Sequence, residues 1–149
     1  MTTTPYIKSI HLTYDSAEKL RAIEQCSDAF NPPLIKINNF YALFNKINQN
    51  ADFIIAEADS ILGYAAIYAN RPETGIAFIT LICVAIPYQR RHIGQCLIEK
   101  CEQIAADRGF HTIRLEVRNN NYGAIQFYRK NNFVKTKQLD SSFLMEKTI

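Results

Sequence analysis

The fold is decided by one stretch, Val84-Ala85-Ile86-Pro87-Tyr88-Gln89-Arg90-Arg91-His92-Ile93-Gly94-Gln95. Here an apolar run typical of a buried strand passes into a basic loop, and the loop opens a long amphipathic helix. The first turn of a helix has free backbone N–H groups and a partial positive charge. Arg90 and Arg91 add charge, and Gly94 removes a side chain where a ligand backbone could approach. We predict an anion site suited to a phosphate or pyrophosphate. The alternative is a solvated basic loop whose glycine serves helix packing.

Working outward from this stretch, the hydrophobic period switches repeatedly between that of strands and that of helices. A helix begins near Asp15 and is expected to end at Asn31-Pro32-Pro33, because proline disfavours helical geometry in the residue before it. The strand, helix and strand between 77 and 117 imply a right-handed crossover joining parallel strands. The other predicted helices span 38–48, 94–108 and 121–131, and the predicted strands span 5–12, 52–58, 62–69, 75–86, 112–117, 133–137 and 142–146. The fold class is therefore α+β, a mixed sheet with helices on both faces.

Length and composition favour one ordinary globular domain spanning residues 1–149. Lys and Arg number 17 against 14 Asp and Glu, a net charge of +3, too mild to indicate nucleic acid binding. No apolar run reaches the ~18 residues of a membrane span, and the start does not resemble a signal peptide. The four cysteines form no C-x-x-C pair and have no histidine at zinc spacing, so no metal is predicted. They indicate reduced, mostly buried thiols and a cytoplasmic protein.

Two motifs together resemble the GNAT superfamily of acyl-CoA-dependent N-acetyltransferases. The loop is similar to the family's Gln/Arg-x-x-Gly-x-Gly/Ala, with Gln89 at the first position, Gly94 at the last and His92 in place of the first glycine. The segment 115–133 resembles the family's strand followed by Asn-x-x-Ala-x-x-x-Tyr, which falls on Asn121 and Tyr128. The two motifs cover residues 80–134. The resemblance implies a mostly antiparallel sheet with a central, splayed pair of parallel strands.

The resemblance also implies acetyl-CoA as co-substrate. Its pantetheine arm would pair with backbone groups exposed where the two strands part. The pyrophosphate would lie on N–H groups of the loop, where His92 either forces the loop open or itself contacts a phosphate. Asn121 would start a helix near the cofactor, and an N-cap role is compatible with this. The cofactor-binding residues implied in this way are Ile82, Cys83, Val84, Gln89, Arg90, Arg91, His92, Ile93, Gly94, Gln95 and Asn121.

Two residues are the catalytic candidates. Tyr128 matches the family's tyrosine near the CoA sulfur and would protonate the leaving thiolate; by periodicity alone it is a core aromatic. Many members of the family place the base, a glutamate, on the fourth strand, where this sequence has no carboxylate at Phe78–Leu81. Glu116 on the fifth strand is the candidate that the resemblance implies, because some relatives have a Leu-Glu-Val-Arg segment there; the alternatives are a bound water as base, or a glutamate paired with Arg114 or Arg118. No histidine accompanies Cys83, which favours direct transfer without an acyl-enzyme.

The predicted function is transfer of an acetyl group from acetyl-CoA to a primary amine of a small molecule or peptide. The acceptor surface is expected around Phe30, Asn31, Pro32, Leu34, Tyr41 and Ser141-Ser142. A non-catalytic acyl-CoA-binding module is the main alternative, and a nucleic-acid adaptor using Arg90, Arg91, Lys135 and Lys137 is a weaker one. No nucleic acid or membrane partner is expected. The last strands of such folds often pair, which allows a homodimer.

Overall fold

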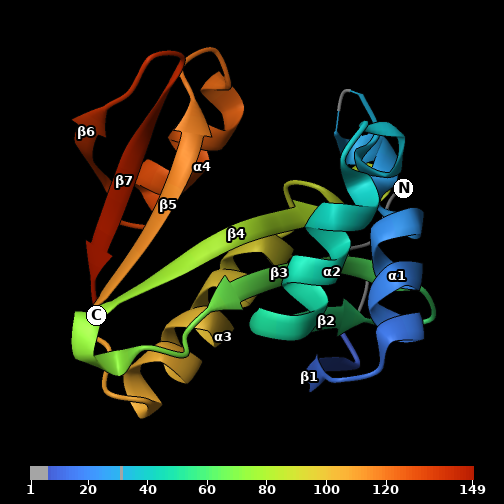
Figure 1. Ribbon diagram of the computed structural model, residues 1–149. Helices are drawn as coiled ribbons and strands as arrows, with labels where there is room; N and C mark the ends of the chain where they lie inside the picture. Colours follow the sequence, from blue (N-terminus) through green and yellow to red (C-terminus); the bar gives the residue numbers. More distant parts are fainter. Residues whose placement is uncertain (1–6, 31) are drawn as a thin grey trace.

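A single seven-stranded sheet organises the chain (Figure 1). The computed structural model describes residues 7–30 and 32–149. The strands lie in the order β1-β2-β3-β4-β5-β7-β6, and all neighbours are antiparallel except β4 and β5. The elements are β1 (Ser9–Thr13), α1 (Ser16–Gln25), η1 (Ser27–Ala29), η2 (Leu34–Lys36), α2 (Phe40–Asn50), β2 (Asp52–Glu57), β3 (Ile61–Tyr68), η3 (Pro72–Thr74), β4 (Ile76–Val84), η4 (Ile86–Tyr88), α3 (Ile93–Asp107), β5 (Thr112–Arg118), α4 (Tyr122–Lys130), β6 (Val134–Gln138) and β7 (Ser142–Thr148).

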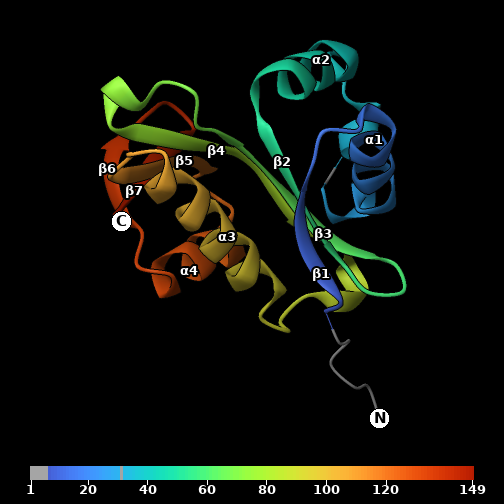
Figure 2. The same ribbon diagram turned by 90° about the horizontal axis from the view of Figure 1, so that it is seen from below.

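Helices cover both faces of the sheet, as the hydrophobic periods predict. In Figure 2, α1 and α2 lie on one face while α3 and α4 lie on the other. Each face has its own apolar core. The core under α1 and α2 includes Phe53 and Tyr64, whose rings stack at 5.2 Å. The core under α3 and α4 includes Leu97, Ile98 and Tyr128. The α+β fold class, with a mixed and mostly antiparallel sheet, is therefore confirmed.

The pairing of β4 with β5 is short. Only Ile76–Phe78 pair with Thr112–Arg114, extended at its start by the N–H groups of His111 and Thr112, which both donate to the Gly75 carbonyl. Beyond that point β4 continues to Val84 and β5 to Arg118, and the two strands diverge, as Figure 1 shows. The central splayed pair expected from the family resemblance is present.

An irregularity in β4 lies just beyond this point. On the other side of β4, Ala66 is opposite Leu81 while Ile67 is opposite Ile79, so Thr80 is an extra residue on β4. Such a β-bulge bends its strand and increases the local twist. Since Thr80 lies two residues past the last β4–β5 pair, the bulge turns β4 away from β5.

Most predicted boundaries agree with the observed ones within about two residues, with two exceptions. The first helix ends at Gln25, well before the prolines, and a short 3-10 turn, Ser27–Ala29, follows it. The first strand begins at Ser9, and positions 5 and 6 of its predicted range lie outside the described residues, as does Asn31. The helix start was predicted well: Asp15 caps α1, its carboxylate accepting from the Ala17 N–H at 2.9 Å.

No helix among residues 7–30 and 32–149 is both long and apolar enough to cross a bilayer.

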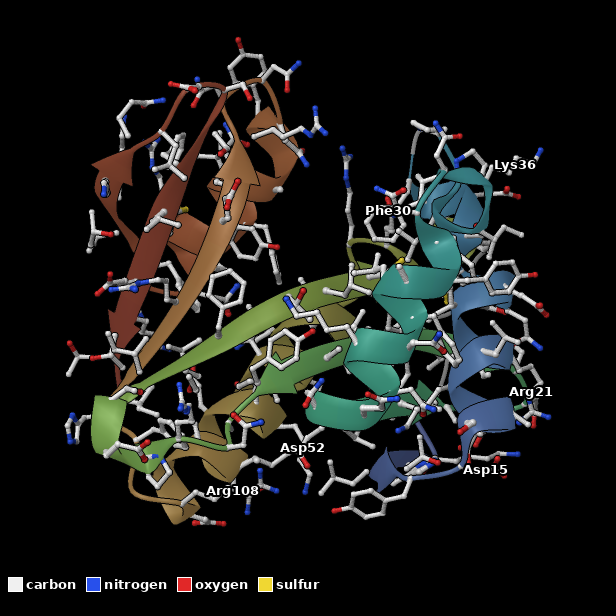
Figure 3. The ribbon with its side chains drawn as sticks, in the orientation of Figure 1. Asp15, Arg21, Phe30, Lys36, Asp52 and Arg108 are labelled. Atoms are coloured by element: carbon white, nitrogen blue, oxygen red, sulfur yellow. The ribbon has the colours of Figure 1, made fainter. Side chains whose placement is uncertain are left out.

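The end of α3 is held to the sheet, because Arg108 forms a two-pronged ion pair with Asp52 of β2 (Figure 3). Such planar pairing is among the stronger forms of charge-assisted hydrogen bond. It fixes the C-terminal end of α3, the helix that begins after the basic loop, to β2, the second strand of the sheet.

Gly63 sets the distance between β3 and β4 near the end of β4. A Cβ on Gly63 would lie 2.5 Å from the Cys83 carbonyl oxygen and 3.2 Å from the Val84 Cα. Both of these are backbone atoms, which cannot move aside as a flexible side chain can. By contrast, Gly123 in α4 has nothing within 4 Å of the corresponding position.

We expect Gly63→Ala to lower the free energy of unfolding by about 1–3 kcal/mol, the usual cost of overpacking. Gly123→Ala is the matched control and should stabilise the protein by up to about 1 kcal/mol, since alanine favours helix. Urea unfolding followed by circular dichroism measures both. Equal effects of the same sign would contradict this explanation of Gly63.

Candidate active site

A hollow lies in the gap between the diverging strands. It has a volume of about 300 Å³ and is lined by Phe78, Ile79 and Thr80 of β4 and by Glu116 and Arg118 of β5. Side chains alternate between the two faces along β5. Leu115 and Val117 are buried in the core under α3 and α4, so Glu116 and Arg118 lie on the opposite face of the sheet. The gap therefore opens toward the face that carries α1 and α2.

The backbone of β4 offers hydrogen-bonding groups to this gap. The Ala85 N–H donates to the Leu62 carbonyl of β3 at 2.8 Å. Because this direction alternates along a strand, Cys83 also faces β3, whereas Ile82 and Val84 face the gap. The Val84 carbonyl receives a hydrogen bond from the Gln89 side chain at 3.0 Å. Of the three residues expected to pair with pantetheine, the register turns Ile82 and Val84 toward the gap and turns the backbone of Cys83 away.

The basic loop contains two non-glycine residues in the left-handed region. Arg90 has φ 63° and His92 has φ 65°. His92 stands immediately before α3 and accepts the Cys96 N–H through its carbonyl at 3.1 Å. The histidine thus adopts a conformation that glycine, which the family has at this place, would adopt without strain. The loop therefore accommodates the Cβ of His92, and α3 still begins at Ile93.

The first-turn amides of α3 face outward from the helix end, as in any helix. Ile93 is buried in the core, so only its main chain is available to a ligand. Gln95 is exposed, and its side-chain amide donates to the Glu99 carboxylate at 3.2 Å, which leaves its main-chain N–H uninvolved in that contact. The main-chain N–H of Gln89, by contrast, already donates to the Ile86 carbonyl at 3.3 Å. The set of main-chain donors therefore begins after Gln89 rather than at it.

Gly94 has a packing reason as well as a ligand reason. A Cβ there would lie 2.8 Å from the Phe127 Cζ of α4. The phenyl ring of Phe127 in turn lies 5.5 Å from that of Tyr128. The alternative in which this glycine serves helix packing is thus supported, and a bulky residue at this position would disturb the neighbour of Tyr128 together with the loop.

Tyr128 lies in the second helix of the motif with its ring buried and its hydroxyl unused. The residue is 9% exposed, and its ring meets Phe133 edge-on at 5.9 Å. Among the described residues its hydroxyl has no hydrogen-bond partner, and it is not among the fully buried polar atoms. Burial, with a smaller contribution from Cys83, raises the pKa of Tyr128 above its ordinary value. At neutral pH the group is therefore a protonated phenol with a free donor.

Glu116 is exposed, and Ser142 of β7 holds one of its oxygens. The Ser142 hydroxyl donates to the Glu116 Oε2 at 2.6 Å, and Ser142 itself is buried. Arg114 pairs instead with Glu146, its Nε donating at 2.9 Å. No ion pair joins Glu116 to Arg114 or Arg118 within the part of the chain described. The partner of Glu116 is therefore Ser142, and not one of the two arginines considered from the sequence.

Cys83 is a buried thiol. Its Sγ donates to the Cys26 carbonyl at 3.5 Å, and the hydrogen bond with Cys26, followed by burial, raises the pKa of Cys83 strongly. A nucleophilic cysteine needs the opposite, a thiolate near neutral pH. In the same core the hydroxyl of Tyr64 is fully buried without a partner. The chemistry of Cys83 agrees with a role in packing.

The remaining predicted positions divide between this region and others. Asn121 caps α4, its side chain accepting the Ala124 N–H at 3.3 Å. Sequence reasoning did not single out Phe78, Thr80 or Arg118 as lining a hollow, although the period of two along each strand was a usable signal. Of the expected acceptor surface, Leu34 is buried and Tyr41 is 79% exposed, while Ser142 lies beside Glu116.

One group of metal-ligating type lies elsewhere. Ligand atoms of His11, Glu18 and Glu57 are within 4.8 Å of one another. The His11 Nε2 and the Glu18 Oε1 are 2.8 Å apart, and Thr13 donates to the other Glu18 oxygen at 2.9 Å. Hydrogen bonds from His11 and Thr13 lower the pKa of Glu18. The group joins β1, α1 and β2 and lies outside the hollow.

Solved structures share this fold over nearly the whole chain. The PaiA N-acetyltransferase from Thermoplasma acidophilum, solved in complex with coenzyme A, is 22% identical with a TM-score of 0.74, covering 95% of this chain and 99% of its own. Ard1 from Thermoplasma volcanium is 21% identical with a TM-score of 0.77, covering 95% and 97%. A GNAT-family acetyltransferase from Staphylococcus aureus is 19% identical with a TM-score of 0.76, covering 94% and 99%.

A family model gives the assignment that such distant structural likenesses cannot. The model described as the acetyltransferase (GNAT) family matches residues 18–133. This range holds both sequence motifs, the diverging strands β4 and β5, the basic loop and Tyr128. The chain therefore belongs to the GNAT family of acetyltransferases.

Proposed function

We propose that the protein transfers the acetyl group of acetyl-CoA to a primary amine of a small molecule or peptide in a ternary complex. The observation that carries the proposal is the gap between β4 and β5, where Ile82 and Val84 offer backbone groups to a ligand. The basic loop and the N-terminus of α3 lie at the end of β4, suited to the pyrophosphate. The coenzyme A in the Thermoplasma acidophilum structure supports the same co-substrate.

The reaction needs a neutral amine, a polarised thioester and a protonated leaving group. The amine nitrogen attacks the carbonyl carbon, and the backbone N–H of Val84 stabilises the oxygen as it becomes negative. Glu116, directly or through a water, takes the proton that the amine loses. The carbon–sulfur bond then breaks, and Tyr128 gives its proton to the departing thiolate. The products are an amide and coenzyme A, and the proton held by Glu116 returns through solvent to the Tyr128 phenolate, so atoms and charge balance.

Both catalytic candidates fit their roles in different ways. Glu116 lines the hollow and keeps one oxygen free, because Ser142 occupies the other. Tyr128 carries a free donor, and its raised pKa keeps the phenol protonated. A protonated, hydrogen-bonded Cys83 argues for direct transfer over an acyl-enzyme. The non-catalytic alternative differs in predicting acetyl-CoA binding without turnover.

Tyr128→Phe should lower kcat on the order of 100-fold while leaving coenzyme A affinity nearly unchanged, because the ring is retained and only the proton donor is lost. Coenzyme A release with an amine panel gives kcat, and calorimetry gives the dissociation constant. Tyr122→Phe on the same helix is the matched control, since Tyr122 is 73% exposed. Binding of acetyl-CoA by the parent protein without turnover of any amine would favour the non-catalytic alternative.

The parent enzyme should also keep its activity on the alkaline side. An ordinary tyrosine ionises near pH 10, and burial raises the pKa of Tyr128, so loss of kcat through its ionisation should begin only above about pH 10. A fall in kcat near pH 8 that persists in Tyr128→Phe would have to arise from another group.

Glu116→Gln should lower kcat, because glutamine cannot accept the amine proton. Ser142→Ala should give a smaller loss of the same kind, since it frees the carboxylate that Ser142 orients. Glu24→Gln, on the exposed side of α1, is the control. A kcat unchanged in Glu116→Gln would assign the proton to a water or another base.

Substitutions of His92 separate its Cβ from its imidazole. With main-chain binding, His92→Gly should bind coenzyme A as tightly as the parent and should raise the free energy of unfolding, because glycine removes the left-handed strain of about 1–2 kcal/mol. His92→Ala keeps the Cβ and should not show this gain. A loss of affinity on the order of tenfold in both variants, measured by calorimetry, would instead show that the imidazole holds a phosphate.

A further inference from the structure

The charges along the exposed face of β5 are not equally satisfied. Arg114, Glu116 and Arg118 follow one another at intervals of two residues on this face. Arg114 is paired with Glu146 of β7, and Glu116 is hydrogen-bonded to Ser142. Arg118 is exposed and, among the described residues, has no ion pair or hydrogen bond through its side chain. Of the three charged groups, the Arg118 guanidinium is therefore the one without a partner among the described residues.

The register explains why Arg118 is left over. Ser142 lies directly opposite Arg118 across β5 and β7, whereas Leu144 lies opposite Glu116. The hydroxyl of Ser142 nevertheless points diagonally to Glu116, at 2.6 Å. This contact commits one oxygen of the Glu116 carboxylate to β7. The carboxylate and the guanidinium therefore stand side by side in the hollow without neutralising each other.

We propose that the acceptor is a small amino acid, a molecule that carries an anionic carboxylate close to the amine that is acetylated. Its amine would lie at Glu116 and its carboxylate at Arg118, whose planar fork matches a carboxylate. The two positions are two residues apart, about 6.7 Å along a strand. Phe78 supplies an apolar surface in the same hollow, and Thr80 supplies a hydroxyl. This inference rests on the proposed function.

The hollow has room for a free amino acid, and its chemistry favours one over a peptide. Its volume of about 300 Å³ is at the lower end of the range of ligand pockets, roughly 300–1,000 Å³. A peptide would have no free carboxylate near its N-terminal amine, because that group is an amide. The Arg118 guanidinium would then stay without the partner for which the site has room.

The test uses three matched acceptors with acetyl-CoA: an amino acid, its carboxamide and its decarboxylated amine, taken over aromatic, aliphatic and basic side chains. The parent enzyme should favour the amino acid in kcat/KM on the order of tenfold, the scale of one hydrogen-bonded charge pair. In Arg118→Gln this preference should vanish through a raised KM for the amino acid alone. Arg118→Lys should keep part of the preference, because the charge remains without the planar fork.

The controls distinguish the possible failures. Arg21→Gln changes an exposed charge on α1, remote from β4 and β5 in Figure 3, and should keep the parent's preference. Acetylation without any preference for the carboxylate, or a preference that survives in Arg118→Gln, would overturn this inference and leave the proposed function standing. Absence of turnover with every amine would overturn both. A weakened affinity of Arg118→Gln for coenzyme A itself would reassign the guanidinium to the co-substrate.

Discussion

Three pairs of residues hold β4 and β5 together, and the candidate active site depends on that pairing stopping where it does. Parallel strands that remain paired satisfy each other's backbone groups and leave nothing for a ligand. Here the pairing ends at Phe78 and Arg114, while both strands continue. The hollow, the free backbone groups of β4 and the exposed face of β5 all lie in the space that the missing pairs would have filled.

The protein stabilises this open edge by local means. The bulge at Thr80 bends β4, the glycine at position 63 lets β3 follow it closely, and the Gln89 side chain satisfies the Val84 carbonyl. Without such partners an unpaired strand edge invites association with other chains. The same Gln89 begins the loop motif, so one residue connects the end of the strand to the anion site. The edge of β4 that faces the gap therefore has a partner at Val84, while Ile82 keeps its backbone groups open to a ligand.

The sequence predicted the elements well because each had a strong period of its own. Leu97, Ile98, Cys101, Ile104 and Ala105 follow a helix period, and all five are buried. Asn132, just beyond the end of α4, has φ 72°, a left-handed conformation that asparagine adopts more readily than most residues. The premature end of α1 was not predicted, because the chain leaves the helix for a 3-10 turn that no proline or glycine marks.

The site was harder to predict than the fold, because its details depend on register. Motif matching pointed to Tyr128, Glu116 and the loop. It could not show that Cys83 faces β3, since a strand's hydrogen-bonding direction needs one fixed contact, here that of Ala85 with Leu62. Nor could it show that Ser142 reaches Glu116 across 26 positions of sequence. Contacts of this kind exist only after the strands are aligned.

The short β4–β5 seam also has a mechanical consequence. On one side lie β1 to β4, and on the other β5, β7 and β6, so the sheet behaves as two plates joined at one corner. A ligand that contacted both strands would add a connection between two halves that otherwise share the main-chain pairing at Ile76–Phe78, the apolar core under α3 and α4, and the ion pair of Lys147 with Glu102.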